Sequence, residues 1–261
     1  MALTRRGVLL GTAAAALAPA LTTAATAAAD VTPQSVLWDG NPARGTSVFD
    51  GLERDPGSIT VANDPQGSFG QCFRYQTQDW DNGKERCESR GLRNPDGSVL
   101  RLNSSYEGRT LYMGWRALWN VNPNNAWIAV YQLHISGASG DQAKSGPFVL
   151  RTVGDGMLHF QLTSPAGATR HIWSTRFPVN QWNRIVVGFR VSRGGDGWVE
   201  FWWNGAQQRF SNGQIRYPGP TLWGSHINHK WGVYRSGSNS GTSVAWLNRA
   251  RMGTSLADVA L

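Results

Sequence analysis

Hydrophobic and polar residues alternate along this chain in short stretches, and Gly, Asn, Asp or Pro separates most stretches from the next. Alternation with a period of two predicts β-strands, whereas the longer period of a helix is nearly absent after residue 30. The expected strands span residues 47–50, 58–62, 70–77, 86–93, 110–119, 126–135, 147–153, 156–163, 169–176, 183–192, 197–203, 206–210, 229–235 and 243–253.

Several turns between these strands carry hairpin signals. The run from Val149 to Gln161 turns at Gly154-Asp155-Gly156, and Ile185–Val191 returns as Trp198–Trp203. Asn204-Gly205 is typical of a two-residue hairpin turn. No segment repeats, which argues against a propeller built of similar blades. Many short antiparallel strands in one domain therefore predict an all-β sandwich or jelly roll.

Three of the expected strands each gather polar side chains on one face. Successive side chains of a strand point to opposite faces, so Gln132 and His134 share a face. The same parity makes two further sets: Lys230, Gly232 and Tyr234, and Lys84, Arg86, Glu88 and Arg90. If the three faces meet, they supply an amide, an imidazole, a phenol and guanidinium groups to one site.

The first 29 residues have the pattern of an export signal. Arg5-Arg6 precede an apolar, Ala-rich stretch that ends in Ala27-Ala28-Ala29 before Asp30. This order of charged, apolar and small residues is typical of a secretory signal, and the arginine pair favours a twin-arginine signal over an ordinary one. We expect a secreted protein whose single domain spans residues 30–261.

Charge indicates the class of partner. Without the export signal the chain has 23 basic and 17 acidic residues, a net charge of +6. Most of the basic residues are arginines, whose planar fork matches carboxylates. We expect an acidic polysaccharide as partner, and neither nucleic acid nor a membrane, because no nucleic-acid motif appears and the Ala-rich stretch is too short to span a bilayer.

The two cysteines, Cys72 and Cys87, form an even pair in a chain with an export signal. Such a pair predicts a disulfide. A hairpin that turned at Asn82-Gly83 would set Cys72 opposite Arg93, so the bond requires a longer loop or strands that are not neighbours.

The 13 tryptophans divide into core and surface candidates. Val199, Phe201 and Trp203 share one face of a strand, which predicts a core position. Trp80, Trp223 and Trp231 lie among polar residues, where an indole face could stack on a sugar ring.

The polar set suits β-elimination on a uronic acid polymer. Removal of the proton on carbon 5 is opposed by the adjacent carboxylate, and groups that neutralise this carboxylate stabilise the developing charge. Gln132 and Arg86 could neutralise it, and neutral His134 could take the proton. Tyr234 could protonate the leaving oxygen on carbon 4, or act as both base and acid.

Three segments resemble the motifs of the jelly-roll alginate lyases. Gln132-Leu133-His134 resembles Q-[IV]-H, Arg86–Arg90 resembles R-[ST]-E-[LV]-R, and Lys230–Tyr234 resembles K-A-G-[VI]-Y. The three motifs follow each other in the family's order. The resemblance implies a concanavalin-like β-jelly roll with Arg86, Gln132, His134 and Tyr234 as the catalytic residues.

The chain departs from these motifs at several positions. Ser89 and Trp231 replace an apolar residue and an alanine, Ser236 replaces a glutamine, and Asn228-His229 replace Tyr-Phe. Lys-Trp-Gly-Val-Tyr-Arg is closer to the related glucuronan-lyase and heparin-lyase-like proteins. The resemblance thus implies a glucuronan-like substrate first, and an alginate or heparin-like one next. The residues expected to bind substrate are Lys230, Arg90, Glu88, Arg235 and Trp231.

The same resemblance implies no cofactor for catalysis and allows a structural calcium ion. His226 and His229 do not indicate a metal site, because no carboxylate or Cys completes one. We expect a monomer.

Two other function classes fit the predicted architecture. A non-catalytic carbohydrate-binding module would need the Trp and Arg residues but not His134 and Tyr234, so the complete set favours a lyase. A glycoside hydrolase would need two carboxylates flanking the bond, and Glu200 has no acidic companion.

Overall fold

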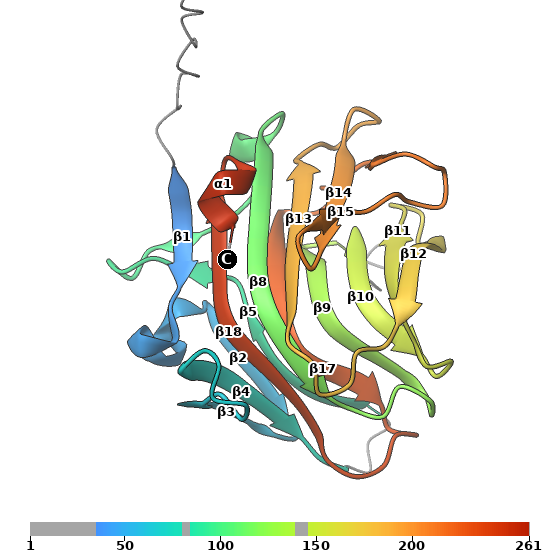
Figure 1. Ribbon diagram of the computed structural model, residues 1–261. Helices are drawn as coiled ribbons and strands as arrows, with labels where there is room; N and C mark the ends of the chain where they lie inside the picture. The colour runs from blue at the N-terminus through green and yellow to red at the C-terminus, as the bar shows by residue number, and fades with distance from the viewer. Residues whose placement is uncertain (1–34, 80–83, 139–145, 261) are drawn as a thin grey trace, which may run out of the picture. The chain divides into compact units, whose positions relative to one another are not determined.

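The alternating pattern folds into two antiparallel β-sheets that pack face to face (Figure 1). The computed structural model describes residues 35–79, 84–138 and 146–260, which belong to one compact unit, Pro33–Leu261. The expected export signal and Trp80 lie outside the described residues. None of the helices in the described ranges is long and apolar enough to cross a membrane.

The larger sheet has nine strands in the order β15-β14-β13-β8-β18-β4-β3, with β1 added beside β18 and β16 beside β14. Its strands are β1 (Val36–Gly40), β3 (Ser58–Asn63), β4 (Gln71–Thr77), β8 (Thr110–Asn120), β13 (Asn183–Arg190), β14 (Trp198–Trp203), β15 (Ala206–Gln207), β16 (Arg216–Pro218) and β18 (Ser243–Gly253).

The smaller sheet has seven strands in the order β12-β11-β10-β9-β17-β5-β2. They are β2 (Gly51–Asp55), β5 (Lys84–Arg90), β9 (Trp127–Ser136), β10 (Phe148–Val153), β11 (Met157–Thr163), β12 (Thr169–Arg176) and β17 (His226–Ser236). The remaining elements are a two-stranded sheet of β6 (Leu92–Arg93) and β7 (Val99–Leu100), two 3₁₀ segments (Pro42–Val48 and Ser104–Tyr106) and helix α1 (Leu256–Val259).

Aromatic side chains from both sheets fill the space between them. Phe160 of the smaller sheet meets Phe201 of the larger one with ring centroids 5.1 Å apart, and Tyr131 meets Trp115 at 4.2 Å. Full burial of one such side chain contributes roughly 1.5–3 kcal/mol. The inward residues of each strand therefore hold the sandwich together, and the alternate residues are left for the outer faces.

The strand pattern predicted most of these elements. Both expected hairpins are present, as β10–β11 and β13–β14, and Asn204 and Gly205 have the positive φ values that the turn after β14 requires. The expected strand at residues 47–50 is wrong, because a 3₁₀ segment and a bend occupy this stretch.

Two irregularities in strand pairing determine which residues lie side by side on the outer face of the smaller sheet. β9 shifts register against β10 between Tyr131 and Ala129, and β17 shifts register against β9 between Trp231 and Tyr234. Gly232, within the second shift, has φ +137°, and a Cβ atom there would lie 2.1 Å from the carbonyl oxygen of Cys87. Only glycine allows β17 to approach β5 so closely while Tyr234 keeps its place opposite Arg86.

Candidate active site

Eight side chains gather on the outer face of β2, β5, β17 and β9. Strand pairing sets Lys230 opposite Arg90 on β5 and opposite Gln132 on β9, and sets Tyr234 opposite Arg86. The alternate residues of these strands, among them Val233 and Leu133, belong to the core. We call the eight residues the ionic face: Glu53, Arg86, Glu88, Arg90, Gln132, His134, Lys230 and Tyr234.

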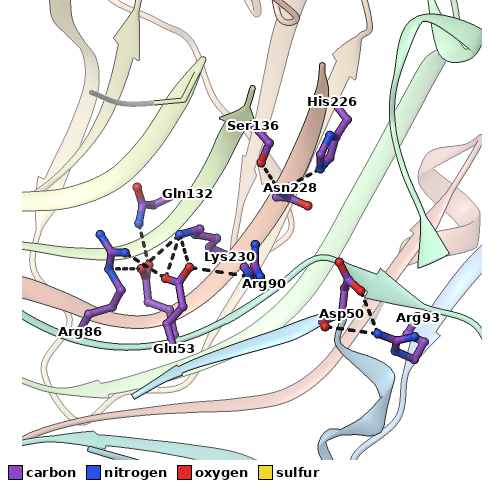
Figure 2. A network of polar contacts seen from close by, with 11 residues as sticks. Asp50, Glu53, Arg86, Arg90, Arg93, Gln132, Ser136, His226, Asn228 and Lys230 are labelled. Atoms are coloured by element: carbon purple, nitrogen blue, oxygen red, sulfur yellow. Dashed lines mark hydrogen bonds and ion pairs between the residues drawn. The ribbon is translucent and has the colours of Figure 1, made fainter. Parts of the chain in front are cut away.

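Glu53 is the centre of the ion pairs in this face (Figure 2). Its carboxylate accepts hydrogen bonds from Lys230 Nζ at 2.9 and 3.0 Å, and lies 3.2 Å from an Arg86 nitrogen and 3.8 Å from Arg90 Nε. Burial alone would raise the pKa of Glu53, but Lys230, Arg86 and Arg90 together hold it below its usual value. Glu53 is therefore charged, and it forms ion pairs with the same cations that would bind an anionic ligand.

Glu88 lies beneath this layer and is fully buried. Gln132 Nε2 donates a hydrogen bond to Glu88 Oε1 at 2.7 Å, and Arg86 Nε lies 3.5 Å from the carboxylate. Burial raises the pKa of Glu88, against the opposing effects of Lys230, Gln132 and Arg86. With no exposed surface, Glu88 is placed to orient Gln132 rather than to touch a ligand, and the amide of Gln132 keeps its second N–H and its oxygen.

His134 is held neutral. Burial lowers the pKa of its imidazole to about 4, and the positive charges of Lys230, Arg86 and Arg90 act in the same direction. Its Nδ1 is buried and has no hydrogen-bond partner among the described residues. At neutral pH the ring therefore has a free lone pair, as a base needs.

Tyr234 packs between Arg86 and Trp127. The Arg86 guanidinium is 4.1 Å from the centre of the Tyr234 ring, and Trp127 packs edge-on against the same ring at 4.9 Å. Arg151 in turn covers Trp127 at 5.3 Å. The phenol is thus fixed in orientation in a positively charged surrounding.

The structure places His134 and Tyr234 on the same face but apart from each other. His134 pairs with Asn228, which is six positions from Tyr234 along β17. Arg86 contacts the Tyr234 ring, and its positive charge is one of those that lower the pKa of His134.

Besides Glu88, two more of the expected substrate-binding residues are buried away from the outer face, which contradicts the expectation. Trp231 is 2% exposed and stacks in the core on Trp38 at 5.9 Å, because its parity on β17 is opposite to that of Lys230. Arg235 has the same inward parity, is 1% exposed, and pairs with Glu85 while donating to Ser243 Oγ at 2.8 Å. Both residues stabilise the fold and cannot reach a polymer at the surface.

The expected disulfide is also wrong, because both cysteines are free. Cys72 lies on β4 of the larger sheet, where its parity sets it on the face opposite to the core residues Phe73 and Tyr75. Cys87 lies on β5 of the smaller sheet and points into the core. The two strands are neighbours in sequence but belong to different sheets, and the two thiols point in different directions.

Other expectations concern Trp223, Ser89 and calcium. Trp223 is half-buried and packs against the core. Ser89, which departs from the motif, shares a hydrogen bond of 2.7 Å with the Tyr75 hydroxyl across the two sheets. No group of three or more His, Cys, Asp or Glu that could hold a metal occurs in residues 35–79, 84–138 and 146–260, and the structural calcium ion stays a prediction.

Sequence reasoning did not find Glu53, Trp127 or Arg151. Glu53 lies on β2, whose residues Gly51–Asp55 are mostly polar and gave no strand signal. Trp127 and Arg151 stand in expected strands, but their approach to Tyr234 depends on the register shifts beside β9.

Three solved structures show the same fold at low sequence identity. They are the endo-β-1,4-glucuronan lyase from the fungus Trichoderma reesei (14% identity, TM-score 0.60, 81% of this chain and 93% of that one), an alginate lyase from Corynebacterium sp. (17%, 0.51, 74% and 79%) and a carbohydrate esterase from the Shiga toxin-encoding bacteriophage phi24B (12%, 0.53, 85% and 99%). Since both lyases and an esterase appear, the likeness establishes the fold only.

The sequence itself decides the family. No curated protein sequence matches the chain. A family model described as polysaccharide lyase matches residues 43–251, a range that contains the whole ionic face. The chain belongs to the polysaccharide lyase family.

Proposed function

We propose that this protein is a secreted lyase that cleaves a uronic acid polymer by β-elimination at the ionic face. A glucuronan-like polymer is the first candidate substrate, and an alginate or heparin-like polymer comes next. The observation that carries the proposal is a neutral imidazole and an oriented phenol on one face, with three cations between and beside them.

The cations supply the first requirement of the reaction. Arg86, Arg90 and Lys230 outnumber the carboxylates of Glu53 and Glu88, so the face has a net positive charge even when both are ionised. A uronate carboxylate competes with Glu53 for these groups, and Gln132 offers a hydrogen bond beside them. Neutralisation of the carboxylate stabilises the negative charge that develops when the adjacent proton leaves.

His134 and Tyr234 carry the proton transfers. The His134 imidazole takes the proton from carbon 5, the electron pair forms the double bond between carbons 4 and 5, and the bond from carbon 4 to its glycosidic oxygen breaks. Tyr234 gives its phenolic proton to that oxygen. Solvent then removes the proton from His134 and restores the one on Tyr234. If Tyr234 alone serves as both base and acid, His134 only positions the substrate.

The experiment is the ultraviolet absorbance of unsaturated uronates, followed over glucuronan, alginate, heparin, hyaluronan and pectate. We expect Tyr234→Phe to lower kcat about 10²–10⁴-fold on the best substrate and to leave polymer binding largely intact, because Phe keeps the ring packing. Tyr112→Phe is the matched control, since Tyr112 lies on β8 of the other sheet, beside Trp202.

Absence of unsaturated product from every polymer would exclude the lyase function. Wild-type turnover by Tyr234→Phe would exclude this mechanism, and binding without cleavage by the unaltered protein would favour a carbohydrate-binding module. Export is tested separately, by whether the mature protein from the culture medium begins at Asp30.

A further inference from the structure

The outer face of the smaller sheet continues beyond the ionic face. Tyr234 on β17 pairs with Ala129 on β9, Ala129 pairs with Arg151 on β10, and Arg151 pairs with His159 on β11. Residues paired in this way form a row perpendicular to the strands, with neighbouring strands about 4.8 Å apart. The row therefore leads from the proposed site across two further strands, β10 and β11.

Arg151 is the unusual member of this row. Its side chain is half-buried, stacks on Trp127, and has one long hydrogen bond, 3.5 Å from Nε to the Thr152 carbonyl. Among the described residues no carboxylate pairs with it, in contrast to Arg86 and Arg90. Burial accordingly lowers the pKa of Arg151, although the group stays charged. A half-buried cation without a counterion is unfavourable until an anion binds beside it.

The groups around Arg151 leave this position open for an anion. Asp155, in the turn between β10 and β11, already binds His159, with 2.7 Å between Oδ2 and Nε2. His171 is exposed and stacks on His159 at 4.1 Å between ring centres. Burial lowers the pKa of His171, and His159 and Arg151 add to this effect, so its ring is a neutral hydrogen-bonding group suited to sugar hydroxyls.

We propose that Arg151 binds the carboxylate of a second uronate unit, so that the polymer lies across the strands from β5 toward β11. The inference rests on the proposed function, because it assumes that the polymer occupies the ionic face. The guanidinium fork can hold a carboxylate through two hydrogen bonds. This second subsite requires repeated carboxylates along the polymer, which a neutral polysaccharide lacks.

Binding must be separated from an effect on Tyr234. Arg151 contacts Trp127, which contacts the Tyr234 ring, so loss of its charge could also change proton transfer. In Tyr234→Phe no phenol can titrate, and dissociation constants measured in this variant report binding alone. The probes are glucuronan oligosaccharides of graded length and the same oligosaccharides with their carboxylates reduced to alcohols.

We expect Arg151→Ala, in the Tyr234→Phe protein, to weaken binding of the longer acidic oligosaccharides about tenfold. Binding of the shortest ones and of the reduced ones should not change. Arg151→Gln should behave like Arg151→Ala, and Arg151→Lys should recover part of the loss. Arg209→Ala is the matched control, because Arg209 is an exposed arginine outside the ionic face whose described hydrogen bond goes to the Gly213 carbonyl.

Equal dissociation constants with and without Arg151 would overturn the inference, as would an equal loss for the reduced oligosaccharides. If the unaltered protein cleaves glucuronan and Arg151 does not affect binding, only the second subsite fails. If the unaltered protein neither binds nor cleaves any acidic polymer, the proposed function fails with it.

Discussion

Arg86 shows how neighbouring side chains determine the role of a single residue in this site. It lies 3.2 Å from Glu53, 3.5 Å from Glu88 and 4.1 Å from the Tyr234 ring. Burial alone would lower the pKa of its guanidinium, but Glu88 and Glu53 raise it, so the charge persists. That charge in turn helps to keep His134 neutral. One residue thus connects the expected base, the expected acid and the carboxylates.

The pKa of His134 predicts the acid limb of the pH profile. Its folded value of about 4 lies below the ordinary 6.5, so the neutral, base-competent form persists as the pH falls and is lost only near pH 4. Above about pH 5 we expect the protonation of His134 to have no effect on kcat/KM. Below that pH, kcat/KM should decline with a midpoint near pH 4. If the midpoint lies near pH 6.5 instead, and His134→Gln removes this decline, then the pKa of His134 is not lowered by its surroundings.

Glu53 predicts a gain of affinity on mutation. Glu53→Gln removes the carboxylate that Lys230, Arg86 and Arg90 share, so a substrate carboxylate no longer has to displace it. We expect KM for the acidic polymer to fall several-fold, by the roughly 1 kcal/mol at stake in a partly exposed ion pair such as Glu53–Arg86. Asp50→Asn is the control, because Asp50 pairs with Arg93 outside the ionic face (Figure 2). An increase in KM would show that Glu53 helps substrate binding.

At the scale of elements, the site depends on β17. This strand has Lys230 and Tyr234 on the outer face and Trp231, Val233 and Arg235 on the inner one. The alternation of side chains along a regular strand predicts this division, and it correctly puts Lys230, Tyr234 and Arg86 on the same outer face. It could not show how β9 meets β17, because the shift between Trp231 and Tyr234 arises from packing between distant strands.

Gly232 allows a test of this local geometry. Gly232→Ala introduces a Cβ atom 2.1 Å from the Cys87 carbonyl oxygen at a φ of +137°. We expect a loss of about 3 kcal/mol or more in the free energy of unfolding, measured by denaturant titration. Gly213→Ala is the control, since Gly213 also has a positive φ but no atom within 4 Å of the added Cβ, and should cost only about 1–2 kcal/mol. Equal losses would mean that close approach to β5 is unimportant.

At the scale of the whole molecule, the class of fold can be predicted from the sequence more readily than which residues are neighbours in space. Local alternation and turn residues indicate a two-sheet sandwich, and three motifs in order indicate the family. The sheet to which a strand belongs is a non-local matter. Cys72 and Cys87 lie on consecutive strands that belong to different sheets. Glu53 lies in the site because β2 pairs with β5, and β2 has no strand signal in the sequence.

Charge distribution leads to a prediction for the molecule as a whole. The chain from Asp30 onward has a net charge of +6, and the ionic face and Arg151 present cations to a polymer that is negatively charged along its length. Added salt shortens the reach of such attraction to about 10 Å at 0.1 M and about 3 Å at 1 M. We therefore expect KM to rise with salt concentration while kcat stays nearly constant, since the chemical step uses groups already in contact. Arg151→Ala should reduce the slope of log KM against log salt, and Arg209→Ala should reduce it less. A KM that does not depend on salt would mean that the cations serve the fold rather than the substrate.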